Sequence, residues 1–259
     1  MPRALFLSPH LDDVAFSCAE PMLCLARDGW EVIAATVFTA SVAAPRGFAL
    51  ACQLDKGLAP EVDYMALRRA EDRACLERLG ATSRHVALPE APHRGYDDVA
   101  ALFGDVRDDD PAPRDAAGAL GALLDALDPD VCAVPLGVGG HVDHRVVVGC
   151  VAARMRAEPS RTWLRYAEEP YSTRRPAELE ALVGGLPDAV PLRLPSRAGT
   201  RRRALDAIEA YATQLPFQFG GARAMRDALG ARFARGTPLW REGPPVAALD
   251  AVLVRPEPA

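Results

Sequence analysis

Two short segments of this 259-residue chain combine histidine and aspartate at spacings that suit a metal centre. The first is Ser8–Asp13, with the sequence SPHLDD, and the second is Gly139–His144, with the sequence GGHVDH. The chain holds five histidines, and three of them fall in these two segments. Two imidazoles and one carboxylate would make a three-ligand site with an open position for water, as catalytic zinc requires. A spare carboxylate beside them could act as a general base, and a spare imidazole as an acid.

Either segment taken alone has an ordinary structural interpretation. Asp12 or Asp13 could cap the helix that follows, and Asp143 could cap a helix that starts near His144, because aspartate is favoured at helix N-termini. His141 could simply be a turn residue. Both segments, however, directly follow predicted strands, and the carboxyl ends of parallel strands form the ligand crevice of an open sheet. Together the two segments therefore predict one shared metal site.

The elements that would position these segments alternate between strand and helix patterns. Short apolar runs predict strands at residues 4–7, 31–38, 85–88 and 131–134. Helical periodicity predicts helices at residues 14–27, 63–79 and 115–127, near residue 144, and at 199–213. One further strand is expected at residues 246–254. This alternation predicts an α/β fold with a Rossmann-like, mostly parallel sheet flanked by helices and the site at the carboxyl ends of its strands.

The chain is expected to form one domain over residues 1–259, because no repeat or linker divides it. Residues 40–62 and 89–114 lack periodicity and are predicted to be loops that cover the substrate, since connections of this length are often functional. The second of them contains the acidic run Asp108–Asp110, for which a solvated loop is expected. From about residue 163 onward the pattern is less regular.

Composition excludes several classes of partner. The chain has 30 basic and 35 acidic residues, a formal net charge of −5, and no basic footprint of the kind that nucleic-acid binding leaves. No apolar run approaches the roughly 18 residues of a membrane-spanning helix. The first residues lack the pattern of a secretory signal, and the six cysteines form no C-x-x-C pair. We therefore expect a cytoplasmic protein with buried thiols; homo-oligomers are common at this size, and the sequence leaves the oligomeric state open.

The two histidine segments carry a family resemblance. The S-P-H-x-D-D segment with the later H-x-D-H is similar to the LmbE-like or PIG-L family of zinc-dependent N-acetylglucosaminyl deacetylases. The likeness extends from residue 3 to about residue 215 through two further stretches: Arg68–Glu71 followed by Leu79–Gly80, and Ala204, Ala207, Tyr211 and Gln214. Leu11 and Val142 stand where the family often has proline, and Thr213 where it has serine. These departures leave the subfamily and the substrate open.

The resemblance implies a hydrolase that removes an N-acetyl or other N-acyl group from an amino sugar in a small-molecule glycoside. Thiol-sugar precursors, aminoglycoside-type or glycopeptide intermediates and N-acetylglucosamine lipids are candidate substrates, and small glycosides are favoured over lipids because no membrane segment is expected. It also implies a metal, Zn²⁺ or another divalent ion such as Fe²⁺, held by His10, Asp13 and His144.

The same resemblance implies roles for four further side chains. Asp12 would be the general base for attack by metal-bound water on the amide carbon, and His141 the electrophilic or general-acid group. Asp143 would orient His141, and Arg68 would contact polar groups of the substrate. Whether His141 or the re-protonated Asp12 delivers the proton to the departing nitrogen stays open.

Two other function classes share part of the pattern. Non-haem Fe(II) oxygenases hold iron with two histidines and one carboxylate. Their carboxylate usually lies two residues after the first histidine on a β-scaffold, whereas Asp13 lies three after His10, and the spare Asp12 suits hydrolysis better. A non-catalytic sugar-binding protein on the same fold would be expected to lack a ligand or the base, and this sequence retains all of them.

Overall fold

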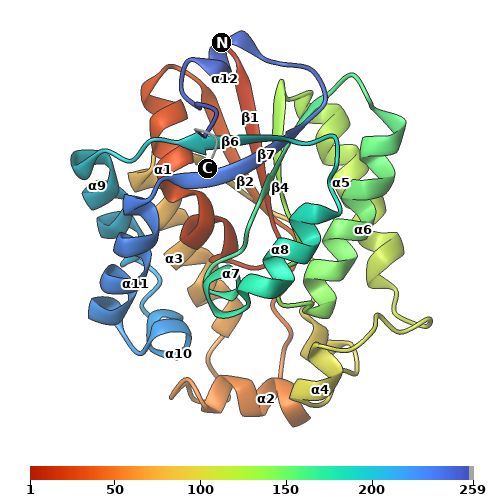
Figure 1. Cartoon of the computed structure of the whole chain (residues 1–259). Helices are drawn as coiled ribbons and strands as arrows, with labels where there is room; N and C mark the ends of the chain where they lie inside the picture. Colours follow the sequence, from red (N-terminus) through yellow and green to blue (C-terminus); the bar gives the residue numbers. More distant parts are fainter. Residues whose placement is uncertain (257–259) are drawn as a thin grey trace.

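A seven-stranded sheet with the strand order β3-β2-β1-β4-β5-β7-β6 runs through the computed structural model, which describes residues 1–256 (Figure 1). The strands are β1 (Arg3–Ser8), β2 (Glu31–Thr36), β3 (Thr82–His85), β4 (Val131–Pro135), β5 (Thr162–Tyr166), β6 (Val190–Leu194) and β7 (Thr237–Glu242). The helices before β5 are α1 (Asp13–Arg27), α2 (Gly47–Leu54), α3 (Tyr64–Arg78), the 3₁₀ helix η1 (Ala91–His93), α4 (Val99–Leu102), α5 (Ala112–Leu127) and α6 (Val142–Ala157). Those after it are α7 (Tyr171–Arg174), α8 (Pro176–Gly184), α9 (Ala198–Ile208), α10 (Leu215–Phe219), α11 (Ala222–Ala234) and α12 (Ala247–Asp250).

The five strands from β3 to β5 are parallel, and β7 runs antiparallel to both β5 and β6. This confirms the mostly parallel α/β sheet expected from the sequence. The strand order reverses between β1 and β4, and ligands of open α/β sheets bind at such a switch point, outside the carboxyl ends of the strands. The segments that follow β1 and β4 are the two histidine segments.

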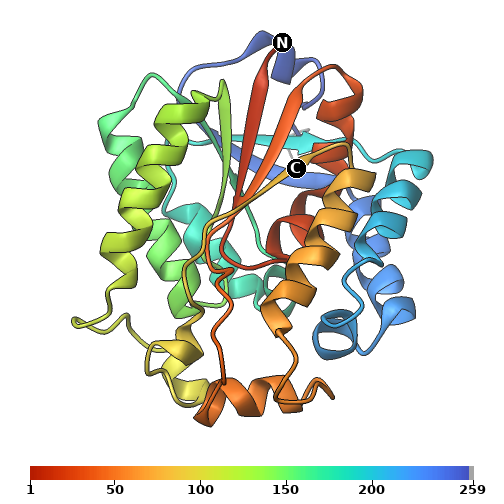
Figure 2. The ribbon, with the colours of Figure 1, turned by 180° about the vertical axis from the view of Figure 1, so that it is seen from behind.

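Helices cover both faces of the sheet, so that its central strands are buried on both sides (Figures 1 and 2). Helices α5 and α6 pack on one face through apolar side chains such as Leu124 and Val147. Helices α1, α3, α9 and α11 pack on the other, with Leu76 and Met225 among the buried contacts. Two buried apolar layers thus hold β1 and β4 rigidly beside each other.

The structure corrects two of the predicted strands. The third strand is Thr82–His85 rather than 85–88; it is the edge strand of the sheet, half exposed, and lacks the continuous apolar run of a buried strand. Residues 246–254 do not form the predicted strand but contain α12 and a single bridge from Val254 to Arg193. Leu249 and Leu253 are both buried four residues apart, which is a helical spacing.

The two segments predicted to be loops are partly folded. Residues 40–62 contain α2, and residues 89–114 contain η1, α4 and the first turn of α5. The less regular C-terminal part supplies β5 and the two antiparallel strands β6 and β7. All six cysteines are free, as expected; three of them are fully buried and the other three are partly exposed. Among residues 1–256, no helix combines the length and apolar character that crossing a membrane requires.

Candidate active site

The first histidine segment makes a tight turn from the end of β1 into α1. The hydroxyl of Ser8 donates a hydrogen bond to the carbonyl of His10 (2.6 Å) and accepts one from the amide of Val14 (3.2 Å). The Asp13 carboxylate accepts a hydrogen bond from the backbone amide of His10 (2.8 Å). These bonds fix the turn at the carboxyl end of β1, where Asp12 precedes the first residue of the helix.

The second segment leaves β4 through a glycine turn and enters α6. Gly139 has φ +93°, a conformation that favours glycine, and a Cβ there would lie 2.9 Å from the ring of Tyr171. His141 caps α6, because its Nδ1 accepts a hydrogen bond from the backbone amide of Asp143 (3.2 Å). In the neutral imidazole the proton is therefore on Nε2, which leaves that atom as a hydrogen-bond donor.

The two segments bring His10, Asp13 and His144 together, as the sequence predicted. One ligand atom of each lies within 4.8 Å of the others. Asp13 Oδ2 is 3.4 Å from His10 Nδ1 and 3.2 Å from His144 Nε2. His144 Nε2 is buried and makes no hydrogen bond to any residue that the structure describes. Two imidazole nitrogens, of which His144 Nε2 is the unpartnered one, and one carboxylate oxygen match the donor set of a catalytic divalent metal site.

A carboxylate holds each of these histidines from its far nitrogen. Asp143 Oδ2 lies 2.9 Å from His10 Nε2, and Glu168 Oε1 lies 3.2 Å from His144 Nδ1. Glu168 is itself fixed, because its two oxygens accept hydrogen bonds from the amides of Gly137 (2.7 Å) and Val138 (3.2 Å). Such outer carboxylates orient metal-binding imidazoles and raise their basicity.

The buried carboxylates make this part of the cavity attract positive charge. Burial alone would lower the pKa of His144, but Asp13 and Glu168 raise it to about 9. For His10, burial is likewise outweighed by Asp13 and Asp143, and its pKa lies well above the usual range. A metal cation would take the place of these protons, so metal binding here is coupled to pH.

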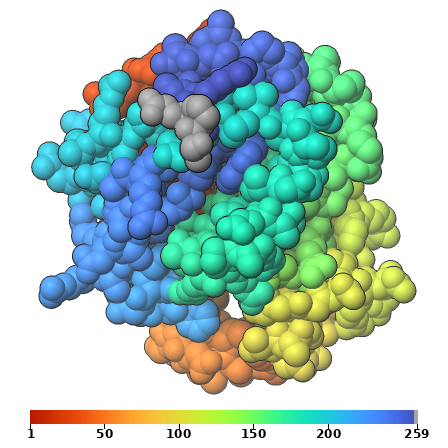
Figure 3. Space-filling model, in the orientation of Figure 1, coloured from red at the N-terminus to blue at the C-terminus, as the bar shows by residue number. Residues whose placement is uncertain are grey.

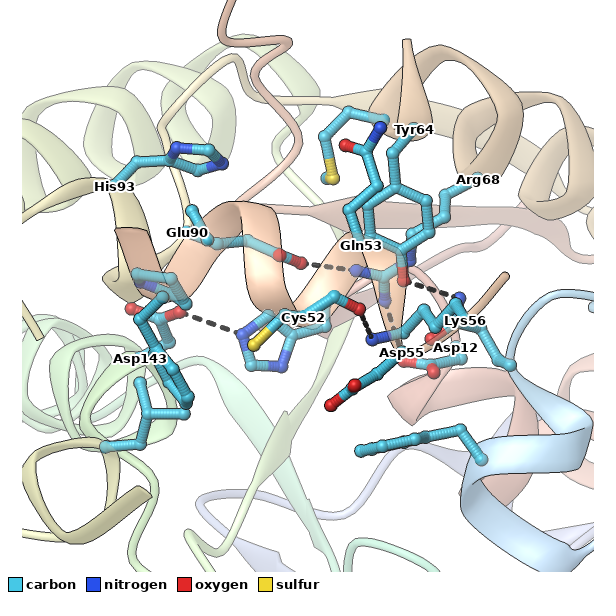
Figure 4. Close-up of a pocket in the computed structure, with 18 of the residues that line it drawn as sticks. Asp12, Cys52, Gln53, Asp55, Lys56, Tyr64, Arg68, Glu90, His93 and Asp143 are labelled. Atoms are coloured by element: carbon cyan, nitrogen blue, oxygen red, sulfur yellow. Dashed lines mark hydrogen bonds and ion pairs between the residues drawn. The ribbon is translucent and has the colours of Figure 1, made fainter. Parts of the chain in front are cut away.

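Asp12 and Arg68 lie next to this cluster. Burial raises the pKa of Asp12 to about 7, although Arg68 opposes the shift. Arg68 Nη2 is 3.6 Å from Asp12 Oδ1, and its other terminal nitrogen bonds to the carboxylate of Glu90 (Figure 4). Asp12 is thus a buried carboxylate poised to titrate near neutral pH, as a general base should be.

The structure differs from the sequence interpretation in the partner of Asp143. Its carboxylate contacts His10 and not His141; only its backbone amide reaches the His141 ring. The other carboxylate oxygen lies 2.8 Å from Arg94, which also bonds to Asp110 (2.9 Å). Arg94 and Asp110 are buried, so the run Asp108–Asp110 is not wholly a solvated loop as expected, and residues 89–114 are anchored to the site.

Two residues of the site, Arg94 and Glu168, were missed by the sequence interpretation. Glu168 lies two residues beyond β5, which neighbours β4, so it is at the same strand-end edge as the histidine segments. That placement was a usable signal for Glu168. Arg94 had no such signal, because it lies in an irregular connection.

A cavity of about 490 Å³ opens onto these residues. Its inner part is lined by His10, Asp12, Asp13, His141 and Asp143, and Arg68 also faces it. Both predicted covering segments, 40–62 and 89–114, contribute side chains to its wall, as does α10. The chemistry available there is a divalent metal site with a carboxylate base and a neutral imidazole donor facing one substrate-sized space.

Comparisons with known proteins agree with this geometry. The family model described as PIG-L, GlcNAc-PI de-N-acetylase, matches residues 5–155. A 2'-N-acetylparomamine deacetylase of Streptomyces fradiae is 30% identical over 220 residues, which cover 82% of this chain and 73% of that protein. Among solved structures, the zinc-inhibited form of a teicoplanin deacetylase has a TM-score of 0.75 at 22% identity, covering 99% of this chain and all of the other. A deacetylase of the A40926 pseudoaglycone has a TM-score of 0.70 at 24% identity, covering 98% and 97%. These two structures share the fold.

Proposed function

Because this chain belongs to the PIG-L family and is an amide hydrolase, we propose that it is a zinc-dependent deacetylase that removes the N-acetyl group of an amino sugar in a small-molecule glycoside. One observation carries the proposal: His10 and Asp13, which line the inner end of a substrate-sized cavity beside the buried Asp12, converge with the fully buried His144. The relative named for 2'-N-acetylparomamine and the structures named for glycopeptide deacetylases support an antibiotic-type glycoside as the substrate class.

His10, Asp13 and His144 would hold the metal, and Zn²⁺ suits two imidazoles and a carboxylate. When bound, such an ion acts as a Lewis acid and lowers the pKa of a coordinated water to about 7. Asp143 and Glu168 fix the two imidazoles from behind, so both ligand nitrogens are aimed at one point before the metal arrives.

Asp12 would take the proton of the attacking water as the new bond to the acetamide carbon forms. Burial raises its pKa above that of an exposed aspartate, which makes it a stronger proton acceptor. The C–N bond can break only when the nitrogen gains a proton, because an amide anion is a poor leaving group. We assign that second transfer to the same carboxyl group, Asp12, which holds the proton at that moment.

His141 would stabilise the negative charge that develops on the acetyl oxygen. Its Nδ1 is occupied by the Asp143 amide, so Nε2–H is available for donation into the cavity. Burial, with the positive charge of His10, lowers the pKa of His141 to about 3. A neutral donor rather than a general acid fits both observations, which leaves the proton delivery to Asp12.

The direct test is acetate release by protein that has been stripped of metal and then reloaded. We expect acetate from N-acetylglucosaminides or 2'-N-acetylparomamine only after one equivalent of Zn²⁺ is added, with the free amine as the second product. Protein kept in chelator is the matched control. Failure to bind a divalent metal, or equal turnover in chelator, would contradict the proposal.

A further inference from the structure

The cavity extends well beyond the group that would be hydrolysed. From Asp12 it continues outward to α2, α4 and α10, and its volume of about 490 Å³ is in the range that holds a drug-sized ligand. Helices α4 and α10 lie on opposite sides of α2 in both ribbon views (Figures 1 and 2). In the space-filling view α2, in orange, is bordered by blue residues near α10 and by yellow residues near α4 (Figure 3). We call this outer part the mouth.

Exposed apolar side chains gather at the mouth. Eight large hydrophobic side chains are exposed among the described residues, and four of them line this one cavity. The four are Val42 (39% exposed), Val62 (36%), Val99 (62%) and Phe217 (63%). Single apolar side chains scattered over a surface need no explanation, whereas several exposed ones around one cavity mark a binding surface.

Two cationic side chains, Lys56 and Arg174, line the mouth, and neither pairs with a carboxylate among the described residues. Lys56, the only lysine of the chain, donates to the carbonyl of Cys52 (3.0 Å) and lies 4.5 Å from the centre of the Phe217 ring. It forms no ion pair with any residue that the structure describes. A polycationic ligand at this point would be repelled by Lys56.

The carboxylates near the mouth are mostly committed to the protein. Asp63 accepts hydrogen bonds from the Ala66 amide (2.8 Å) and from Ser41 (2.7 Å), and Glu90 is paired with Arg68. Among the described residues, this leaves Asp55 as the carboxylate at the mouth with a free side chain (Figure 4). The negative charges of Asp55 and Asp63 are matched by the positive charges of Lys56 and Arg174, so the mouth has no net charge with which to attract a ligand of high positive charge.

We propose that the substrate carries, next to its N-acetyl sugar, an uncharged apolar aglycone, aryl or alkyl, that packs between Phe217 and the α4 side of the mouth. This inference rests on the proposed deacetylase function and narrows its substrate class. Phe217 and Val99 are its specificity-determining residues, since both are exposed without a ligand and would lose water contact with one.

The test compares the zinc-loaded enzyme on N-acetylglucosaminides that differ only in the aglycone: methyl, hexyl and phenyl, with 2'-N-acetylparomamine as a cationic substrate. We expect the KM for the hexyl or phenyl glycoside to be at least about tenfold below that for the methyl glycoside, from the apolar area buried. In Phe217→Ser and Val99→Ser the ratio should shrink to about threefold. Val254→Ser removes an exposed valine outside the cavity and should leave the ratio as in the parent.

Calorimetry on the same protein separates the two proposals. The deacetylated phenyl and methyl glucosaminides are titrated into the zinc-loaded enzyme, and tighter binding of the phenyl product supports the apolar mouth without any need for turnover. Acetate release with equal KM values across the aglycones, or the lowest KM for 2'-N-acetylparomamine, would overturn this inference and leave the deacetylase intact. Preferential phenyl binding without acetate release from any substrate would overturn the proposed function instead.

Discussion

The inner and outer ends of the cavity are built in opposite ways. The inner wall consists of buried, charged side chains at the carboxyl ends of β1, β4 and β5, and its carboxylates are hydrogen-bonded or ion-paired. The mouth presents exposed apolar side chains on short helices and irregular turns of the connections. Strands fixed in a packed sheet can hold a reacting group to a fraction of an ångström, whereas connections can change without disturbing the core. The difference suggests that the reaction is set by the inner wall and the choice of substrate by the mouth.

The largest effect should come from the base at the inner wall. Asp12→Asn keeps the size of the side chain and removes its ability to take a proton, so kcat should fall by roughly 10²–10⁴-fold. Zinc content, measured by atomic absorption, should stay at the parent level because Asp12 is not among the proposed ligands. The apolar preference of the mouth, measured by product binding, should also persist.

Near-full turnover by Asp12→Asn would remove the base assignment. Loss of zinc together with activity would instead place Asp12 among the ligands. The first result would leave the inner wall without its proposed proton acceptor, whereas the second would change only the role of Asp12 within that wall.

The inner wall was largely predictable from the sequence, because its key groups lie within two short segments directly after strands. The types and order of His10, Asp12 and Asp13 were enough to predict a metal site once the strand before them was recognised. The α/β pattern then placed the second segment at the same edge. The contact between Asp143 and His10 was not predictable, because residue spacing does not tell which of two nearby imidazoles a carboxylate reaches.

The mouth was much less predictable. Residues 40–62 showed no periodicity, yet they contain α2. Its two buried residues, Ala49 and Gln53, line the cavity. The path of each connection determines which of its side chains come together, and secondary-structure propensity says little about that path. Phe217 stands within α10, far in sequence from Val42 and Val99, and only the fold brings them to one rim.

Residues 89–114 contribute side chains to both the inner wall and the mouth of the cavity. A substitution of Arg94 tests whether this connection supports the inner wall. Arg94 pairs with the buried Asp143 and Asp110, so Arg94→Met would remove the cation that these two buried carboxylates share and should cost about 3 kcal/mol of unfolding free energy. Arg107→Met is the matched control on the same connection, because Arg107 pairs with the exposed Asp109 and should change stability little. Urea titrations of both variants give the measurement. Equal free energies of unfolding for the two variants would mean that residues 89–114 contribute to the mouth alone and do not support the inner wall.

The smallest effect expected at the inner wall concerns Glu168, which touches no substrate and acts through His144. Glu168→Gln keeps the shape but weakens the hold on His144 Nδ1, so zinc affinity should fall about 10–100-fold, measured by competition with a chelator. At saturating zinc most of the turnover should return, since the ligand atoms themselves are intact. Glu178→Gln is the control: Glu178 bonds to the neighbouring Gly139 amide (2.9 Å) without reaching His144. If both variants keep the zinc affinity of the parent, the carboxylate that contacts the far nitrogen of His144 does not contribute to metal binding. The inner wall would then differ from the mouth only in the burial of its side chains.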